Sequence, residues 1–223
     1  MTKLLALAAL LAAGTITGAP TAGAERVRSV SPGDDIVTTA AEGGQRCTLG
    51  YTFTNPAGRT YGITAGHCNR HRSNSVTDRT TGAVGRFVLA VGHPDRALED
   101  DYGLIDFGTA RSTASLAGIP VTGISAPVRG RPICHDGVRT GRACGTLHGR
   151  LTATQYATSG MPASIPGDSG GPVWQLNPDR SATVVGIWLG EREDTDGQRY
   201  GRFTGLVDVL ADIADAGGLT TTT

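Results

Sequence analysis

Apolar and polar residues alternate along much of the chain. Between residues 46 and 54 the apolar positions are every second one: Cys47, Leu49, Tyr51 and Phe53. This period of two is typical of a strand with one buried face. The turn sequence at 55–58 follows, and residues 60–65 return as a partner strand. The same reasoning predicts further strands, separated mostly by glycine or proline, at 86–91, 102–107, 145–152, 173–176 and 183–189.

One helix is predicted, near the C-terminal end. Leu206, Val209, Leu210 and Ile213 recur at helical spacing, and Gly217 is a suitable stop. Residues 110–131 are rich in Ser, Ala, Gly and Pro and are expected to link two halves, and residues 220–223 are expected to fray. The pattern therefore predicts an all-β chain that ends in a helix.

Composition agrees with this reading and excludes some functions. Glycine accounts for 33 of 223 residues, and charged residues make up only 18%, which favours short strands and tight turns. The 20 basic and 20 acidic residues give a formal net charge of zero. That balance excludes a broad basic surface for nucleic acid, and it gives no electrostatic reason to expect a membrane-surface protein.

The first 24 residues have the pattern of a secretory signal peptide. Lys3 precedes an apolar run at 4–13, and the small residues Ala22-Gly23-Ala24 form a cleavage site. A membrane anchor is the alternative, but ten apolar residues are far fewer than the ~20 that a spanning helix needs. We expect a secreted, extracellular protein, with residues 25–223 as the mature domain and no membrane association after cleavage.

The cysteines are even in number, as expected for disulfides in an exported chain. They are Cys47, Cys68, Cys134 and Cys144, and they contain no C-x-x-C, which argues against a zinc knuckle. Four cysteines allow three pairings. Pairing of neighbours would close two short loops, each worth ~2–4 kcal/mol, but the sequence alone leaves the pairing open.

Three short segments carry candidate chemistry. Gly167-Asp168-Ser169-Gly170-Gly171-Pro172 places a serine between glycines that let the backbone turn sharply. A bare G-x-S-x-G also occurs in α/β-hydrolases, whose histidine follows the serine. Here all five histidines precede Ser169: His67, His71, His93, His135 and His148. Subtilisin order would place Asp34 or Asp35 first, without a helical pattern around them. The sequence does contain a histidine, an aspartate and a serine in the order of a third type of catalytic triad. The other two segments are Thr64-Ala65-Gly66-His67-Cys68 and Asp101-Tyr102-Gly103-Leu104-Ile105.

In these three segments the sequence resembles the chymotrypsin-like serine peptidases, and in particular their secreted bacterial branch, the streptogrisins and α-lytic protease. The run from Cys134 to Thr146 is similar to the C-x-x-G-x-x-T-G…C-G-T hairpin of that branch. The resemblance covers nearly the whole mature chain. It implies two six-stranded antiparallel Greek-key barrels, at about 30–110 and about 120–205, followed by the helix at about 206–216.

The resemblance also implies the roles of the site residues. His67 is the general base, Asp101 orients it, and Ser169 attacks the carbonyl, while the backbone N–H groups of Gly167 and Ser169 form the oxyanion hole. It implies the disulfides Cys47–Cys68 and Cys134–Cys144. The expected function is a secreted serine endopeptidase that acts as a monomer on polypeptides, without a metal or cofactor.

Some residues compete for these roles. Asp95, Asp100 and Asp106 are alternatives to Asp101, and His71, His93 and His148 are interpreted as surface residues. The acidic turn at 191–197 could hold Ca²⁺, although acidic turns are more often simply solvated.

The expected substrate pocket departs from the pattern of the family. Ala163 stands where trypsin-type enzymes have a basal aspartate, and Trp188, Leu189 and Glu191 occupy the pocket wall, where Glu191 replaces a glycine. Cleavage after Arg or Lys through a basal carboxylate is therefore not expected. These departures keep an alternative open, namely a catalytically weak or silent homologue that binds extracellular peptides or surfaces.

Asp168 needs a partner to hold the loop beside Ser169. In the bacterial branch an arginine just after the first hairpin cysteine plays this part, and here that place holds His135. We expect protonated His135 to donate to Asp168, which would raise the pKa of the histidine. The alternative is a surface His135, with Asp168 bound by Arg139 or by a neutral hydrogen bond.

Overall fold

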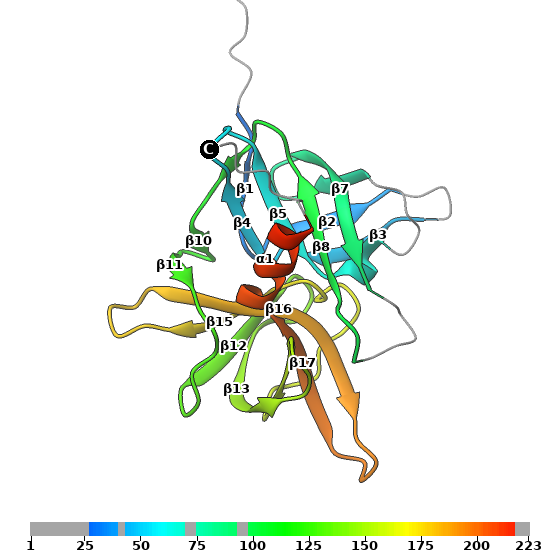
Figure 1. Ribbon diagram of the computed structural model, residues 1–223, viewed down its shortest axis with the longest axis vertical. Helices are drawn as coiled ribbons and strands as arrows, with labels where there is room; N and C mark the ends of the chain where they lie inside the picture. Colours follow the sequence, from blue (N-terminus) through cyan, green and yellow to red (C-terminus); the bar gives the residue numbers. More distant parts are fainter. Residues whose placement is uncertain (1–26, 40–42, 70–74, 93–97, 217–223) are drawn as a thin grey trace, which may run out of the picture.

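The described residues form two large β-sheets, a two-stranded sheet and one α-helix (Figure 1). The computed structural model describes residues 27–39, 43–69, 75–92 and 98–216. The signal peptide expected at 1–24 and the frayed end expected at 220–223 lie outside the described residues. The all-β prediction with one C-terminal helix is confirmed.

The first sheet closes into a barrel because two of its segments belong to one bent run of chain. Its order is β3-β2-β6-β7-β8-β5-β4, and only residues 49–50 separate the two edge segments, β3 and β4. Counted as one strand, they leave a six-stranded closed sheet. The bounds are β2 Asp35–Thr38, β3 Gln45–Thr48, β4 Tyr51–Thr54, β5 Thr60–Thr64, β6 Ser75–Asp78, β7 Val84–Val91 and β8 Tyr102–Asp106.

The second sheet closes through an extra pairing. The strands β16-β15-β12-β13-β14-β17 form a ring because β16 also pairs with β17, while β10 and β11 extend the sheet beyond β16. The bounds are β10 Ser115–Leu116, β11 Ile119–Ile124, β12 Pro132–Gly137, β13 Gly141–Arg150, β14 Gln155–Ser159, β15 Pro172–Leu176, β16 Ala182–Glu193 and β17 Arg199–Gly205.

Within the two barrels every strand pair is antiparallel, as expected. Outside the barrels, β11 runs parallel to β16, and β1 (Ser29–Val30) runs parallel to β9 (Arg111–Ser112). One expectation needs correction: the segment 110–131, expected to be a linker, contains the three strands β9, β10 and β11. Two of these strands have only two residues and the third has six, so the sequence contains no long run in which apolar residues alternate with polar ones.

Helix α1 (Leu206–Asp215) packs over the junction of the two sheets (Figure 1). Leu206, Val209 and Ile213 are fully buried and share a hydrophobic cluster with Leu104 of the first sheet and Ile187 of the second. Each such side chain contributes about 1.5–3 kcal/mol relative to an exposed one. The helix therefore helps to fix how the two barrels meet.

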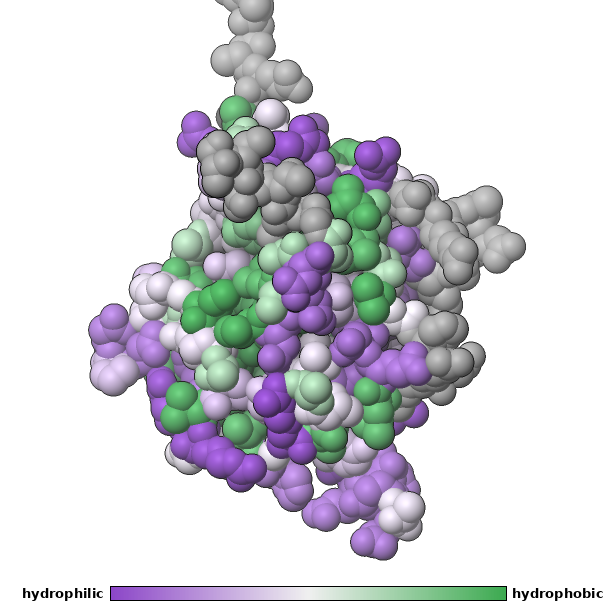
Figure 2. Space-filling model, viewed as in Figure 1, coloured by the Kyte–Doolittle hydropathy of each residue, from purple (hydrophilic) through white to green (hydrophobic). Residues whose placement is uncertain are grey.

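The surface around α1 is mixed. Hydrophilic residues cover the helix in Figure 2, with hydrophobic ones scattered beside it. None of the helices among the described residues is long and apolar enough to cross a bilayer.

The disulfides pair as the resemblance implies. Cys47 bonds to Cys68, and Cys134 bonds to Cys144. The first joins β3 to the short 3-10 helix η1 (Gly66–Asn69), and the second links β12 to β13 across a register pair. Each therefore ties down a segment that carries candidate chemistry.

Candidate active site

His67 and Asp101 form a hydrogen-bonded pair between two strand ends. The antiparallel pairing of β5 with β8 places Thr64 opposite Gly103, so His67 after β5 and Asp101 before β8 come together. Nδ1 of His67 lies 2.7 Å from Oδ2 of Asp101, and the backbone N–H of His67 donates to Oδ1 at 2.9 Å. The two side chains are only 17% and 18% exposed. A carboxylate at Nδ1 favours the tautomer whose Nε2 can accept a proton.

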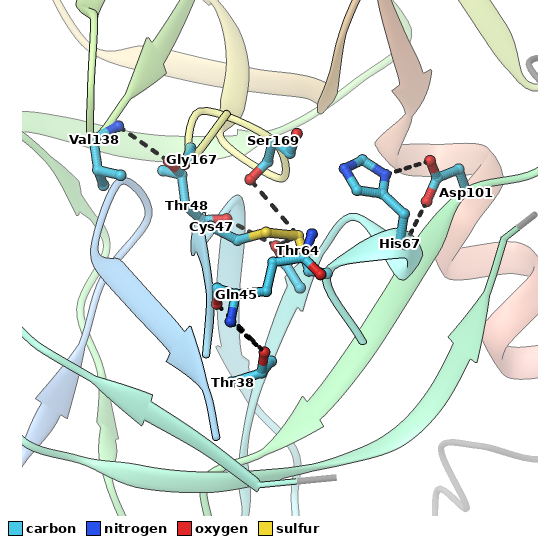
Figure 3. Close-up of a disulfide and its surroundings, with 11 residues drawn as sticks. Thr38, Gln45, Cys47, Thr48, Thr64, His67, Asp101, Val138, Gly167 and Ser169 are labelled. Atoms are coloured by element: carbon cyan, nitrogen blue, oxygen red, sulfur yellow. Dashed lines mark hydrogen bonds and ion pairs between the residues drawn. A yellow bond between two sulfur atoms is a disulfide. The ribbon is translucent and has the colours of Figure 1, made fainter. Parts of the chain in front are cut away.

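Ser169 lies on the loop that faces this pair. Its carbonyl oxygen accepts from the backbone N–H of Thr48 at 2.8 Å and lies 3.9 Å from Sγ of Cys68, the neighbour of His67. Figure 3 shows Ser169 next to the imidazole, above the Cys47–Cys68 disulfide. In the described part of the chain no hydrogen bond joins the Ser169 hydroxyl to His67. Such bonds are often long in unliganded sites.

Two glycines allow this close approach. A Cβ on Gly66 would lie 1.8 Å from the carbonyl oxygen of Val91. Gly170 has a φ of +85°, and a Cβ there would lie 1.9 Å from Oγ1 of Thr64. A larger residue at either position would push η1 or the serine loop away from its neighbour.

The loop presents two unused backbone donors. No acceptor among the described residues takes a hydrogen bond from the backbone N–H of Gly167 or of Ser169. Their carbonyls, by contrast, are held: the Thr48 hydroxyl donates to Gly167 at 2.9 Å, and the backbone N–H of Val138 donates to that hydroxyl at 3.0 Å. Fixed carbonyls and free N–H groups suit a loop that stabilises negative charge on a bound group.

Asp168 is anchored by the hairpin turn and not by His135. It accepts from the backbone N–H groups of Arg139, Thr140 and Ile165 at 2.8–3.1 Å and from the Thr140 hydroxyl at 2.7 Å. Burial alone would raise the pKa of Asp168, but these donors hold it below its ordinary value. The expectation that protonated His135 donates to Asp168 is wrong.

His135 is a neutral core residue. It is fully buried, neither ring nitrogen has a hydrogen-bond partner in the described structure, and the ring stacks on Trp188 at 4.0 Å. Burial lowers the pKa of His135 to about 4, against a weaker opposite effect of the Asp168 and Asp136 carboxylates. The predicted rise of this pKa and the alternative of a surface His135 are therefore also wrong.

A pocket opens beside the serine loop. It has a volume of about 90 Å³, and its lining includes Met161, Ala163, Glu191, Arg199 and Gly201. The strand that supplies Glu191 is tied to the loop, because Trp188 donates from its ring N–H to the Ser164 hydroxyl at 3.2 Å and accepts from the backbone N–H of Gly170 at 2.7 Å. One lining residue contacts the segment that leads to Ser169, because the backbone N–H of Ser164 donates to Oε1 of Glu191 at 3.2 Å.

Two of the four expected pocket residues do not line it. The register between β16 and β17 shifts between Trp188 and Gly190, so that Leu189 has no partner across the ladder. Leu189 packs instead into the core cluster of the first sheet, while Trp188 is buried behind Gly201. Ala163 and Glu191 line the pocket as expected.

The competing residues have other partners. Asp100 accepts from the Thr154 hydroxyl, and Asp106 pairs with Arg59. His148 is exposed on β13, whereas His71, His93 and Asp95 lie outside the described residues.

The acidic turn has internal partners as well. Oδ1 of Asp194 accepts from the backbone N–H groups of Asp196 and Gln198, and Glu191 pairs with Arg199. Within the described ranges no three His, Cys, Asp or Glu side chains form a metal-binding group.

Several residues of the site were not predicted. They are Thr48 and Thr140, which hold the loop, and Ser164 and Arg199, which contact Glu191. Of these, only Thr140 had a signal in the sequence, as the threonine of the hairpin motif.

Comparison with known sequences finds serine proteases among the relatives of this chain. Serine protease 2 of Streptomyces fradiae is 26% identical over 67% of this chain and 89% of its own length. An uncharacterized protein of Mycobacterium tuberculosis is 31% identical over 82% of both chains. Streptogrisin-C of Streptomyces griseus is 30% identical over 58% of this chain and 30% of its own length. No protein-family profile matches the chain.

Solved structures share the fold. Nocardiopsis protease aligns with a TM-score of 0.60 at 22% identity, over 82% of this chain and 96% of its own. A glutamic acid specific serine protease aligns with a TM-score of 0.62 at 21% identity, over 83% of this chain and 98% of its own.

Proposed function

The chain belongs to the chymotrypsin-fold serine proteases, in their bacterial streptogrisin and α-lytic protease branch, and from this membership we propose that it is a secreted serine endopeptidase. The proposal rests above all on the His67–Asp101 pair, which lies beside the Ser169 loop with its two unused N–H donors. Two disulfides suit an oxidising, extracellular setting.

The proposed reaction uses residues of the chain alone. The Ser169 oxygen attacks the carbonyl carbon of the scissile bond while Nε2 of His67 takes the hydroxyl proton, and Asp101 stabilises the resulting imidazolium. The N–H groups of Gly167 and Ser169 donate to the tetrahedral oxyanion, at about 3–4 kcal/mol per donor. The intermediate collapses, the amine leaves with the proton from His67, and an acyl group remains on Ser169. Water activated by His67 then releases the acid and restores the serine.

Hydrolysis of a protein substrate and of a peptide library by purified protein tests the proposal. Ser169→Ala and His67→Ala should each lower kcat by several orders of magnitude, because the two residues act as a unit. Circular dichroism and thermal unfolding serve as the control that both variants keep the fold. Turnover in the variants similar to wild type would refute the assignment.

The alternative is a weak or silent homologue that binds extracellular peptides. It is favoured by Glu191, which lines the pocket and pairs there with Arg199. The two functions differ in one measurement, since a silent homologue would bind peptides with equal affinity before and after Ser169→Ala and would release no product.

A further inference from the structure

The pocket beside Ser169 contains one ion pair. Glu191 and Arg199 carry the only formal charges among the described residues that line it. One carboxylate oxygen of Glu191 accepts from the backbone N–H of Ser164 at 3.2 Å, and the other contacts the Arg199 guanidinium. Both oxygens are thus engaged within the protein, and the pocket has no net charge.

The two partners are held very differently. The Glu191 side chain is 12% exposed, whereas that of Arg199, at the start of β17, is 60% exposed. In Figure 1, β16 and β17 form a projecting hairpin. An exposed cation in a surface ion pair contributes about 1 kcal/mol or less. A half-buried carboxylate that lost its cation would keep the cost of its desolvation. Glu191 is therefore the fixed member of the pair, and Arg199 is the replaceable one.

Arg199 also limits the size of the pocket. With the pair in place the volume is about 90 Å³. Arg199 forms part of the wall, so removal of its side chain would widen the pocket and leave Glu191 without a cation. One side chain thus controls both the space and the charge that a substrate meets.

We propose that Arg199 determines the side-chain preference of this pocket: paired with Glu191, it restricts the site to a small uncharged side chain next to the cleaved bond. A substrate lysine or arginine would have to displace Arg199 from Glu191, and a substrate carboxylate would meet Glu191 itself. The inference rests on the proposed peptidase function and adds a substrate class to it.

Two variants test the proposal in opposite directions. Arg199→Ala leaves an unpaired carboxylate, so kcat/KM for substrates with Arg or Lys at the cleaved bond should rise by about tenfold to a hundredfold, relative to Ala. Glu191→Gln leaves an unpaired guanidinium, so preference should move toward Asp and Glu. Arg192→Ala is the matched control, because Arg192 is an exposed arginine of the same hairpin that does not line the pocket.

Binding of benzamidine gives a readout that needs no turnover. In a Ser169→Ala background, Arg199→Ala should lower the benzamidine Kd by about tenfold or more in calorimetry, and Arg192→Ala should leave it unchanged. Tighter binding without hydrolysis in any variant would support the role of Arg199 and refute the peptidase function. Unchanged benzamidine affinity in Arg199→Ala, or an equal change in Arg192→Ala, would overturn the role of Arg199.

Discussion

Buried His135 should make the protein less stable in mild acid. The ring is fully buried against Trp188 without a hydrogen-bond partner in the described structure, and burial lowers its pKa to about 4. In the unfolded chain a histidine has a pKa of ~6.5. Above that value both states are neutral, so His135 has no pH-dependent effect. As pH falls from about 6.5 to about 4, the unfolded state binds a proton that the native state excludes, and stability falls.

The size of the effect follows from the two pKa values. A difference of about 2.5 units at about 1.4 kcal/mol per unit gives roughly 3 kcal/mol of lost stability by about pH 4. His135→Phe keeps a flat ring for the stack on Trp188 and removes the titration. It also removes two buried nitrogens without partners, each costing about 1–3 kcal/mol at any pH. Any packing cost of the larger ring is likewise independent of pH.

The assay is urea unfolding, with disulfides intact, at several pH values between about 7 and about 4.5. The stability difference between His135→Phe and wild type should grow in favour of the variant as pH falls, by about 2–3 kcal/mol over this range. His148→Phe is the matched control, a histidine that is exposed on β13. A constant difference for His135→Phe would refute the reasoning.

Three more outcomes are expected. Burial and the nearby Asp78 carboxylate raise the pKa of Asp34 to about 7, so the native state keeps a proton that the unfolded state releases near pH 4; Asp34→Asn should therefore stabilise the protein by about 2–4 kcal/mol near pH 8, in thermal or urea unfolding, and little near pH 4. Thr48→Val removes the hydroxyl that donates to the Gly167 carbonyl. It should lower the free energy of unfolding by about 2 kcal/mol in urea unfolding, and its effect on kcat should exceed its effect on KM. Asp101→Asn should lower kcat about 10⁴-fold in peptide hydrolysis while circular dichroism stays unchanged, because the imidazole of His67 is no longer held in the tautomer whose Nε2 accepts a proton.

The catalytic segments could be predicted because their chemistry leaves a local signature. A histidine after a strand, an acid before one and a serine between glycines are readable one segment at a time, and the order of His67, Asp101 and Ser169 excluded other arrangements. The C-terminal helix had a clear period, and its three buried residues are among those predicted.

The partner of Asp168 could not be predicted, for a physical reason. Three of its four donors are backbone N–H groups, which every residue except proline has. In addition, five consecutive residues of β12 are buried, so no alternation shows which way His135 points.

The pocket wall was misjudged because of a strand irregularity. The register shift between Trp188 and Gly190 turns Leu189 into the first barrel. A bulge changes which face a side chain occupies without changing the sequence pattern. Arg199 gave no signal because it meets Glu191 only through the hairpin that folds β17 back onto β16.

Labelling with a fluorophosphonate probe tests the central claim most directly. The probe forms a covalent bond only with a serine that is activated as a nucleophile. Peptide mapping by mass spectrometry should find one adduct, on Ser169, which is lost in Ser169→Ala and strongly slowed in His67→Ala. A folded protein that takes up no probe, or that carries it on another residue, would contradict the account.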